Sequence, residues 1–492
     1  MDFNIVSRLQ IPKVDLAHME WPRFDISRLR WSRMPKLRIG NAVARLPIVQ
    51  GGMGVGISLS GLASAVANEG GIGIIAANSI GMLDSDYYAS HKDANAIALR
   101  QEIIKAREKT SGILGVNIMV AVNDFHALLK VAIEQRVDMV FLGAGLPISG
   151  IPVEEFRSAG VKVVPIVSSA RAAALIFKSW IKKYHDIPDA VVVEGPKAGG
   201  HLGFKEEQIN DPAFSLENIL PEVISGIRYY EEKCRRHIPV IAAGGVFSGQ
   251  DIYDLLKLGV SGVQMGTRFV ATHECDADIR FKKAYISCKE DDIGIIKSPV
   301  GMPGRAIKNK FLRDVSFGEK KSIKCAWRCL KSCDIKNAPY CISRALDNAR
   351  RGQLDEGFAF AGSNAFRVEK IISVRELMQE LERQYLNAEE RGASRLRGEY
   401  EKALERLVSL KEAYTSALRH GLSPQRLGFE RAEDRVKESL QEEHMGIIDR
   451  ISTLKREYLK ALDNANRLKD ELLRLFERYA LFNGGATDLA LT

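Results

Sequence analysis

The sequence predicts an α/β fold in which a (β/α)8 TIM barrel is followed by a C-terminal antiparallel α-helical coiled-coil hairpin. Between residues 46 and 270, eight short apolar runs alternate with helical patterns. These runs lack a strict polar alternation, which is typical of parallel strands covered on both faces. Eight such units in succession favour a closed barrel over an open doubly wound sheet. From about residue 376, apolar residues instead recur at alternating intervals of four and three, as in a coiled coil.

The expected strands follow one another at similar spacing along the chain. They are residues 46–50, 71–77, 113–119, 139–143, 162–167, 190–194, 239–244 and 262–266. Helical patterns at 60–70, 124–136 and 249–259 lie between strands, and a glycine that suits a helix C-cap ends the first and the last of these.

Two heptad series make up the expected hairpin. The first is Leu396, Tyr400, Ala403, Leu407, Leu410, Tyr414 and Ala417, and the second is Ile447, Ile451, Leu454, Tyr458, Ala461, Ala465, Leu468, Leu472 and Leu475. The sequence HGLSP at 420–424 places a glycine and a proline between them, which predicts a turn.

These patterns divide the chain of 492 residues into successive regions. A basic N-terminal arm (1–45) precedes the barrel (46–375), which includes a Cys-rich segment (325–341). The hairpin (376–482) and a flexible C-terminus (483–492) follow. Hydrophobic residues make up 46% of the chain and charged residues 27%, which is typical of a globular protein with a sizeable core.

Composition also bounds the cellular setting and the partners. The N-terminus lacks the basic patch and apolar run of a signal peptide, and no stretch reaches about 18 apolar residues, so we expect a cytoplasmic protein that is not bound to a membrane. Seven cysteines, an odd number, fit a reducing compartment. The net charge is +9, with 9 basic and 4 acidic residues in 1–45. We interpret this as a solubilising surface with a basic N-terminal arm and expect no nucleic-acid partner. The alternative is an acidic partner, such as a carrier protein or a nucleic acid.

Most of the unusual residues directly follow the expected strands. The loops read QGGMG (50–54), NIM (117–119), EGPKAGGH (194–201), AGGV (243–246) and MGTRF (265–269). In a barrel of this class these loops lie on the C-terminal face, where active sites form. This places His201 at the mouth of the barrel.

The loops after the last two strands carry Gly244, Gly245, Gly266 and Thr267. Such loops commonly bind a phosphate through backbone N–H groups, although glycines in tight turns are an equally simple explanation. Loop 50–54 and the amide of Asn117 add donors and acceptors around the same mouth. Together they indicate a flat heterocycle joined to a phosphate, such as FMN.

The motifs QGGMGVGIS, GGIGIIAAN, GAGLP, EGPKAGGHLGF, IPVIAAGGV and GVQMGTRF resemble, in order and spacing, those of the nitronate monooxygenase family, which also contains flavin-dependent enoyl-ACP reductases. The resemblance covers about residues 40–375 and implies an FMN-binding TIM barrel. It implies that His201 is the catalytic histidine. The cofactor-binding residues that it implies are Gly51, Gly52 and Met53 along the flavin, Asn117 at its ring, Gly199 and Gly200 beside it, and Gly244, Gly245, Gly266 and Thr267 at its phosphate.

One departure from the family pattern concerns the His201 loop. The more common family loop is E-G-x-E-A-G-G-H, whereas this chain has Pro196 and Lys197 before AGGH. The resemblance therefore implies the flavin site more firmly than it implies nitronate as the substrate.

The resemblance implies two oxidoreductase activities. In nitronate oxidation, an anionic carbon acid gives an electron to FMN and O2 reoxidises the flavin, and an imidazole near neutral pH orients the anion or exchanges the carbon proton. In an NAD(P)H-dependent enoyl-thioester reductase, the same imidazole protonates the substrate carbon. A structural histidine is the alternative to both.

Four cysteines gather in CAWRCLKSCDIKNAPYC: Cys325, Cys329, Cys333 and Cys341. Thiolates are ligands of zinc and of iron–sulfur clusters, but these spacings are wider than the usual C-x-x-C. If the segment is helical, three thiols instead form one stripe on a buried face. We expect reduced structural cysteines and no metal.

Residues 358–368 (FAFAGSNAFRV) resemble the segment that closes the family's barrel domain. Their glycine, serine and asparagine either contact flavin or substrate, or form a helix-capping turn.

The hairpin suggests a function of another class. About a hundred residues of heptad helix are not needed to complete a barrel, so the hairpin could be a scaffold or assembly module that joins copies of the chain. Alternatively, it pairs only with itself.

Overall fold

The computed structural model describes residues 33–84, 86, 91–323, 325, 328–421 and 434–482, with the side chains of 418–421, 434–448 and 476–482 left out. The expected loop at 420–424 and the expected flexible C-terminus therefore lie largely outside the described residues, as does most of the N-terminal arm. Two compact units divide the chain: Arg33–Ala388, and Glu389–Thr492 with Met1–Ser32.

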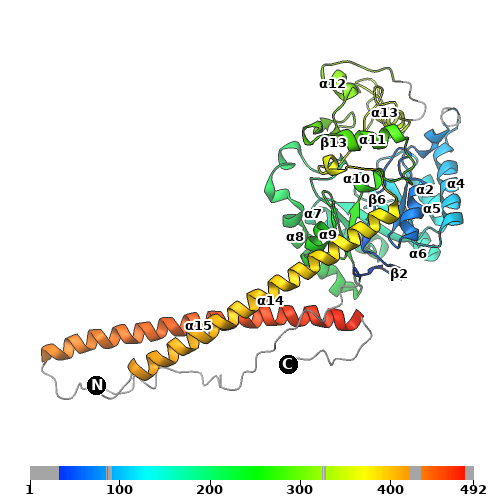
Figure 1. Ribbon diagram of the computed structural model, residues 1–492. Coiled ribbons are helices and arrows are strands. Elements are labelled where there is room, and N and C mark those ends of the chain that lie inside the picture. The colour runs from blue at the N-terminus through cyan, green and yellow to red at the C-terminus, as the bar shows by residue number, and fades with distance from the viewer. Residues whose placement is uncertain are drawn as a thin grey trace. The chain divides into compact units, whose positions relative to one another are not determined.

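All eight expected barrel strands are present and parallel, which confirms the predicted fold class (Figure 1). They are β3 (Ile48–Gln50), β4 (Gly73–Ala76), β5 (Leu114–Met119), β6 (Met139–Gly143), β7 (Lys162–Val167), β8 (Val191–Glu194), β10 (Val240–Ala243) and β11 (Gly262–Met265). Their order in the sheet is β3-β11-β10-β8-β7-β6-β5-β4. Strands that follow one another in the chain are also neighbours in the sheet, as in a (β/α)8 barrel, if the short β9 (Gly200–His201), which belongs to another sheet, is left out.

The ring of strands closes between β3 and β4. A parallel bridge joins Val49 to Ile72, and the buried Gln50 side chain accepts a hydrogen bond of 2.9 Å from the backbone N–H of Ile74 through Oε1. The side-chain amide of Gln50 therefore adds a hydrogen bond to β4 beyond the end of the backbone pairing between β3 and β4.

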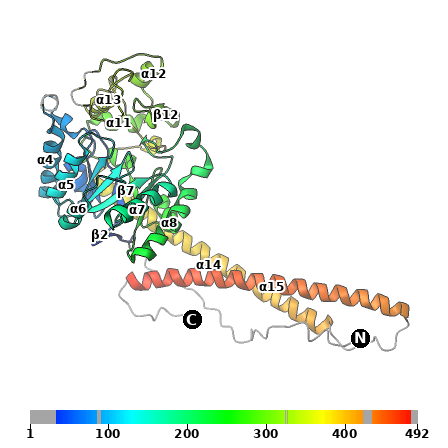
Figure 2. The ribbon, with the colours of Figure 1, turned by 180° about the vertical axis from the view of Figure 1, so that it is seen from behind.

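Helices surround the strands in both ribbon views (Figures 1 and 2). They are α2 (Ser60–Asn68), α4 (Ala94–Lys109), α5 (Phe125–Glu134), α6 (Val153–Ala159), α7 (Ala170–Tyr184), α8 (Leu216–Cys234), α9 (Gly249–Lys257) and the short α10 (Thr267–Val270). Among the described residues no helix is long and apolar enough to cross a membrane.

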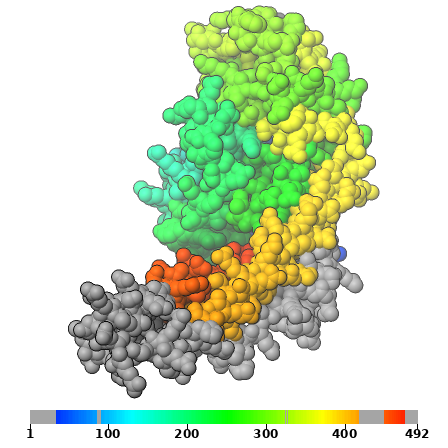
Figure 3. Space-filling view, turned by 60° about the vertical axis from the view of Figure 1, so that its left-hand side comes forward, coloured from blue at the N-terminus to red at the C-terminus, as the bar shows by residue number. Residues whose placement is uncertain are grey.

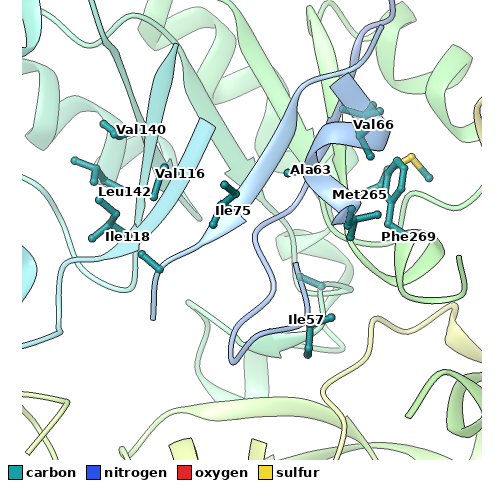
Figure 4. Close-up of a cluster of buried hydrophobic side chains, with 14 of the residues drawn as sticks. Ile57, Ala63, Val66, Ile75, Val116, Ile118, Val140, Leu142, Met265 and Phe269 are labelled. Atoms are coloured by element: carbon teal, nitrogen blue, oxygen red, sulfur yellow. The ribbon is translucent and has the colours of Figure 1, made fainter. Parts of the chain in front are cut away.

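In most barrel strands, alternate residues belong to two separate apolar cores. Ile74 and Val164 point into the barrel, whereas their neighbours Ile75 and Val163 face the helices. Figure 4 shows part of the outer core, where Ile75 and Val116 lie on strands, and Ala63 and Val66 on α2. This period of two is why the strands read as continuous apolar runs in the sequence.

Two further groups of strands complete the barrel unit. The hairpin β1 (Leu37–Ile39) and β2 (Ala42–Ala44) buries Leu37 and Ile39 in the inner core. A three-stranded antiparallel sheet contains β12 (Ile293–Lys297), β13 (Pro303–Ile307) and β9 (Gly200–His201). The helices α11 (Ile279–Ser287), α12 (Lys310–Ser316) and α13 (Ile342–Arg350) lie in the same part of the chain.

The long helix α14 (Val374–Gly421) begins within the barrel unit. Its first turns bury Leu377, Leu381 and Tyr385 in the outer core, and Gln384 Oε1 accepts a hydrogen bond of 2.8 Å from Gly249 N at the start of α9. In Figure 3 this part of α14, in yellow, lies against the green surface of the barrel unit.

In the second unit, α14 and α15 (Asp434–Phe482) lie side by side as an antiparallel pair (Figures 1 and 2). Their shared core contains seven of the expected seam residues, all buried: Tyr400, Ala403, Leu407, Tyr458, Ala465, Leu468 and Leu472. The heptad spacing therefore predicted the hairpin correctly.

Candidate active site

One cavity of about 290 Å³ opens at the C-terminal ends of the barrel strands. Each predicted catalytic or cofactor-binding residue of the sequence lines it. Loop 51–53 follows β3, Asn117 lies in β5, the loop with His201 follows β8, and the remaining glycines and Thr267 follow β10 and β11. The lining residues predicted from the sequence are His201, Gly51, Gly52, Met53, Asn117, Gly199, Gly200, Gly244, Gly245, Gly266 and Thr267.

The floor of the cavity is backbone packed closely against Asn117. A Cβ added to Gly52 would lie 2.3 Å from Asn117 Cβ, so no larger residue fits there without movement of the floor. Gly51 N donates a hydrogen bond of 2.8 Å to Met265 O, which fixes the same loop to β11. The result is a closely packed floor, with no side chain at Gly51 or Gly52, on which a planar ring can lie flat.

At one end of the cavity, four loops join into a cradle that we call the glycine cradle: Gly244–Gly245, Gly266–Thr267, Lys197 and Gly362–Asn364. Gly244 and Gly245 have φ of 95° and 87°, which favours glycine. Gly362 N donates to Thr267 Oγ1 at 3.0 Å, and Asn364 Nδ2 donates to Gly245 O at 2.6 Å.

One polar atom in the glycine cradle has no partner. Ser363 Oγ is buried and makes no hydrogen bond to the described residues. Ser363 lines a second pocket, which shares Lys197, Gly244, Gly245 and Asn364 with the cavity. Unpaired buried hydroxyls are costly, so a ligand oxygen at this end would satisfy it. A cradle of glycine backbone with a free hydroxyl fits a phosphate, and the flat floor beside it fits a ring.

His201 is positioned by a strand that only the structure reveals. Gly200 and His201 form β9, which pairs with Gly304 and Arg305 of β13. His201 Nε2 lies 2.7 Å from Oγ of the buried Ser298, and the ring stacks edge-on against Phe360 with 5.1 Å between ring centroids. Burial lowers the pKa of His201 to about 4, so the imidazole is neutral at pH 7.

Glu194 is a cavity residue whose role the sequence did not predict. It ends β8, and its side chain lines the same cavity as His201. Burial raises the pKa of Glu194 to about 7. A carboxyl group in this environment exchanges a proton near neutral pH. The sequence signals were its position as the last residue of a buried strand and as the first residue of the EGPKAGGH loop.

Apolar residues form another part of the cavity lining, which we call the apolar wall, and the sequence predicted it only in part. It is formed by Met119, Leu330, Ile342, Leu346 and Phe360, which also line the cavity. Three of these come from the Cys-rich segment and the helix α13 that follows it. Met119 and Phe360 lie in the NIM loop and in segment 358–368, which the sequence analysis had singled out. Leu330, Ile342 and Leu346 are distant from the glycine motifs, and no local pattern connects them to the site.

The Cys-rich segment lies next to this wall but is not helical in its described residues, so the stripe expected for a helix does not form. Cys329 Sγ lies 3.3 Å from Ser343 Oγ, and all four cysteines are free. Within the residues that the structure describes, no three His, Cys, Asp or Glu side chains are arranged to hold a metal ion. The expectation that no metal binds at Cys325, Cys329, Cys333 and Cys341 stays a prediction.

The chain matches the family model described as nitronate monooxygenase over residues 37–384. A probable nitronate monooxygenase of Staphylococcus aureus (strain JH9) is 27% identical over 306 residues, covering 55% of this chain and 77% of the relative. Among solved structures, FabK from Thermotoga maritima is 28% identical with a TM-score of 0.56, covering 72% of this chain and 96% of FabK.

A nitroalkane oxidase from Streptomyces ansochromogenes shares the fold, with 24% identity, a TM-score of 0.54, and coverage of 70% of this chain and 97% of the oxidase. The barrel, the cavity at its C-terminal face and the family match agree with one another. The chain belongs to the nitronate monooxygenase family and is a flavin-dependent oxidoreductase.

Proposed function

We propose that this chain is an FMN-dependent oxidoreductase of the nitronate monooxygenase type, which oxidises an alkyl nitronate or a similar carbon acid with O2. The observation that carries the proposal is His201: a neutral imidazole in the cavity, held by Ser298 beside a flat floor of glycine backbone. A structural histidine would not need to line the cavity that the loops of the barrel mouth enclose.

The residues present support FMN as the cofactor. Gly51, Gly52 and Asn117 provide the surface for its ring, and the glycine cradle with Ser363 suits its phosphate. When bound there, FMN supplies the electron acceptor for the carbon acid and the group that O2 reoxidises.

The side chains of this chain bind and orient the substrate. Ser298 occupies Nε2 of His201, which leaves Nδ1 for a ligand. In the tautomer with the proton on Nδ1, the ring donates a hydrogen bond to an anionic nitronate oxygen; in the other tautomer, Nδ1 accepts a proton from carbon. The wall of Met119, Leu330 and Phe360 excludes water and packs against the alkyl part of the substrate.

An anaerobic absorbance titration tests the proposal. The purified protein, His201→Ala and the control His237→Ala are each mixed with a propyl nitronate, NADH and NADPH; His237 is an exposed residue that pairs with Glu231. We expect nitronate to bleach the flavin of wild type and control, and to do so at least about tenfold more slowly in His201→Ala.

Rapid bleaching by NADH or NADPH alone would contradict the proposal. In that case the function is an NAD(P)H-dependent enoyl-thioester reductase, and the apolar wall would receive the acyl chain.

A further inference from the structure

Lys197 occupies a position in the glycine cradle where the more common family loop has glutamate. Its side chain lines the cavity, and its stem lies over Gly245: a Cβ added to Gly245 would meet Lys197 Cβ at 3.0 Å and Cδ at 3.1 Å. The lysine therefore lies directly above one of the two glycines that shape the cradle.

The backbone of Lys197 is part of the cradle as well. Ser363 N donates a hydrogen bond of 3.1 Å to Lys197 O, and the hydroxyl of the same serine is unpaired. The preceding residue, Gly362, donates its N–H to Thr267 Oγ1. Arg305 donates through its guanidinium to Ala198 O at 3.3 Å and to Pro196 O at 2.9 Å. The residues on either side of Lys197 are thus fixed, while its own side chain is exposed.

The charges around Lys197 leave its ammonium group available. It makes no ion pair or hydrogen bond to any residue that the structure describes. Two carboxylates line the second pocket together with Lys197. Asp251 accepts hydrogen bonds from Phe247 N and Ser248 N at the start of α9, and Asp254 accepts from Gln250. Glu194 lies at the end of β8 and has a pKa raised to about 7 by burial. A cation above a glycine cradle favours an anionic ligand.

We propose that Lys197 and Ser363 bind the phosphate of the flavin, so that the cradle holds this group by a lysine cation and a hydroxyl as well as by glycine backbone. The proposal rests on the proposed FMN site and assigns two ligands to it that the family motif does not supply. Lysine at this position then strengthens the selection of a phosphorylated flavin over riboflavin, because riboflavin has the same ring and no phosphate.

The test compares the binding of FMN and riboflavin to the apoprotein by quenching of flavin fluorescence. In Lys197→Gln we expect the Kd of FMN to rise about tenfold, at the lower end of the range for a charged hydrogen bond because the side chain is exposed, with the Kd of riboflavin unchanged. Ser363→Ala should weaken FMN binding selectively too. Added salt should weaken FMN binding less in Lys197→Gln than in wild type.

Two variants control for charge. Lys182→Gln on α7 removes the same charge away from the cradle and should leave both dissociation constants unchanged, whereas Lys197→Glu should weaken FMN binding further than Lys197→Gln. The proposal is overturned if Lys197→Gln leaves both constants unchanged or changes them equally. If wild type binds neither flavin, the proposed function fails as well.

Discussion

His201 and Glu194 line the same cavity, and burial shifts their pKa values in opposite directions. Burial disfavours the charged form of each, so the pKa of His201 falls to about 4 and that of Glu194 rises to about 7. Near pH 7 the site thus holds a neutral imidazole and a carboxyl group that is partly protonated. The sequence predicted His201 through its motif, but it gave no sign of Ser298, which lies 97 residues further along the chain.

Removing the Ser298 hydroxyl tests whether it positions His201. Ser298→Ala leaves Nε2 without its partner at 2.7 Å. We expect the rate constant of flavin reduction by nitronate to fall about fivefold to tenfold, with FMN affinity unchanged, because one hydrogen bond contributes about 1 kcal/mol. Anaerobic stopped-flow absorbance measures the rate, and Ser298→Thr should restore much of it. An unchanged rate in Ser298→Ala would show that the contact does not orient the ring.

Glu194 predicts how stability changes with pH. Its pKa in the folded protein, about 7, is above the unfolded value of 4.5, so its contribution to stability is complete below pH 4.5 and is lost as pH rises through 7. Glu194→Gln removes this group, so the free energy of unfolding of the apoprotein should be higher in the variant than in wild type. We expect this difference between variant and wild type to be larger at pH 8 than at pH 5, by on the order of 1–2 kcal/mol.

Urea unfolding of the apoprotein at the two pH values measures this difference. Glu222→Gln on the exposed face of α8 is the control. A difference between wild type and Glu194→Gln that does not depend on pH would contradict the raised pKa. His201 acts in the opposite sense, since its contribution is lost as pH falls from 6.5 through about 4.

At the scale of elements, the sequence predicts the barrel strands well because each is buried on both faces. It does not predict the sheet of β9, β12 and β13, because β9 has only two residues and its partner strands lie about a hundred residues away. That sheet positions His201. Local pattern can identify a catalytic histidine but cannot supply the long-range pairing that orients it.

The exposure and pKa values of the cysteines yield a prediction about thiol reactivity. Cys234 and Cys325 are exposed, whereas burial raises the pKa of Cys275, Cys288 and Cys329 to about 11. Because the thiolate is the reactive form, a thiol reagent at pH 8 should label the first two rapidly and the other three slowly.

Cys234→Ser and Cys325→Ser should each remove part of the rapid phase. Metal analysis should find well below one zinc or iron per chain. Labelling that accelerates with a chelator, together with about one metal per chain, would contradict the expectation of reduced, metal-free cysteines.

The whole molecule combines a barrel unit that has its own core with a helical unit. The boundary between the two compact units falls after Ala388. It therefore lies just after Tyr385, a residue of α14 that is buried in the barrel core. In the helical unit the seam is filled by α14 and α15 themselves, while Val408 and Leu459 remain exposed, at 54% and 38%. We propose that these outer faces join copies of the chain.

Deleting residues 389–492 tests this proposal. The truncated chain should remain folded and bind flavin, because the barrel core is complete without these residues. Its mass in solution, measured by light scattering, should be that of a monomer, whereas the mass of the full chain should be that of an oligomer. Equal numbers of subunits in both proteins would remove the hairpin from assembly.

The identity of the cofactor tests the central claim most directly. The purified protein is denatured, and the released flavin is identified and quantified by chromatography and mass spectrometry. The cavity with its flat floor and glycine cradle predicts FMN, at about one molecule per chain after reconstitution. A protein that retains no flavin under these conditions, or that prefers riboflavin to FMN, would contradict the account.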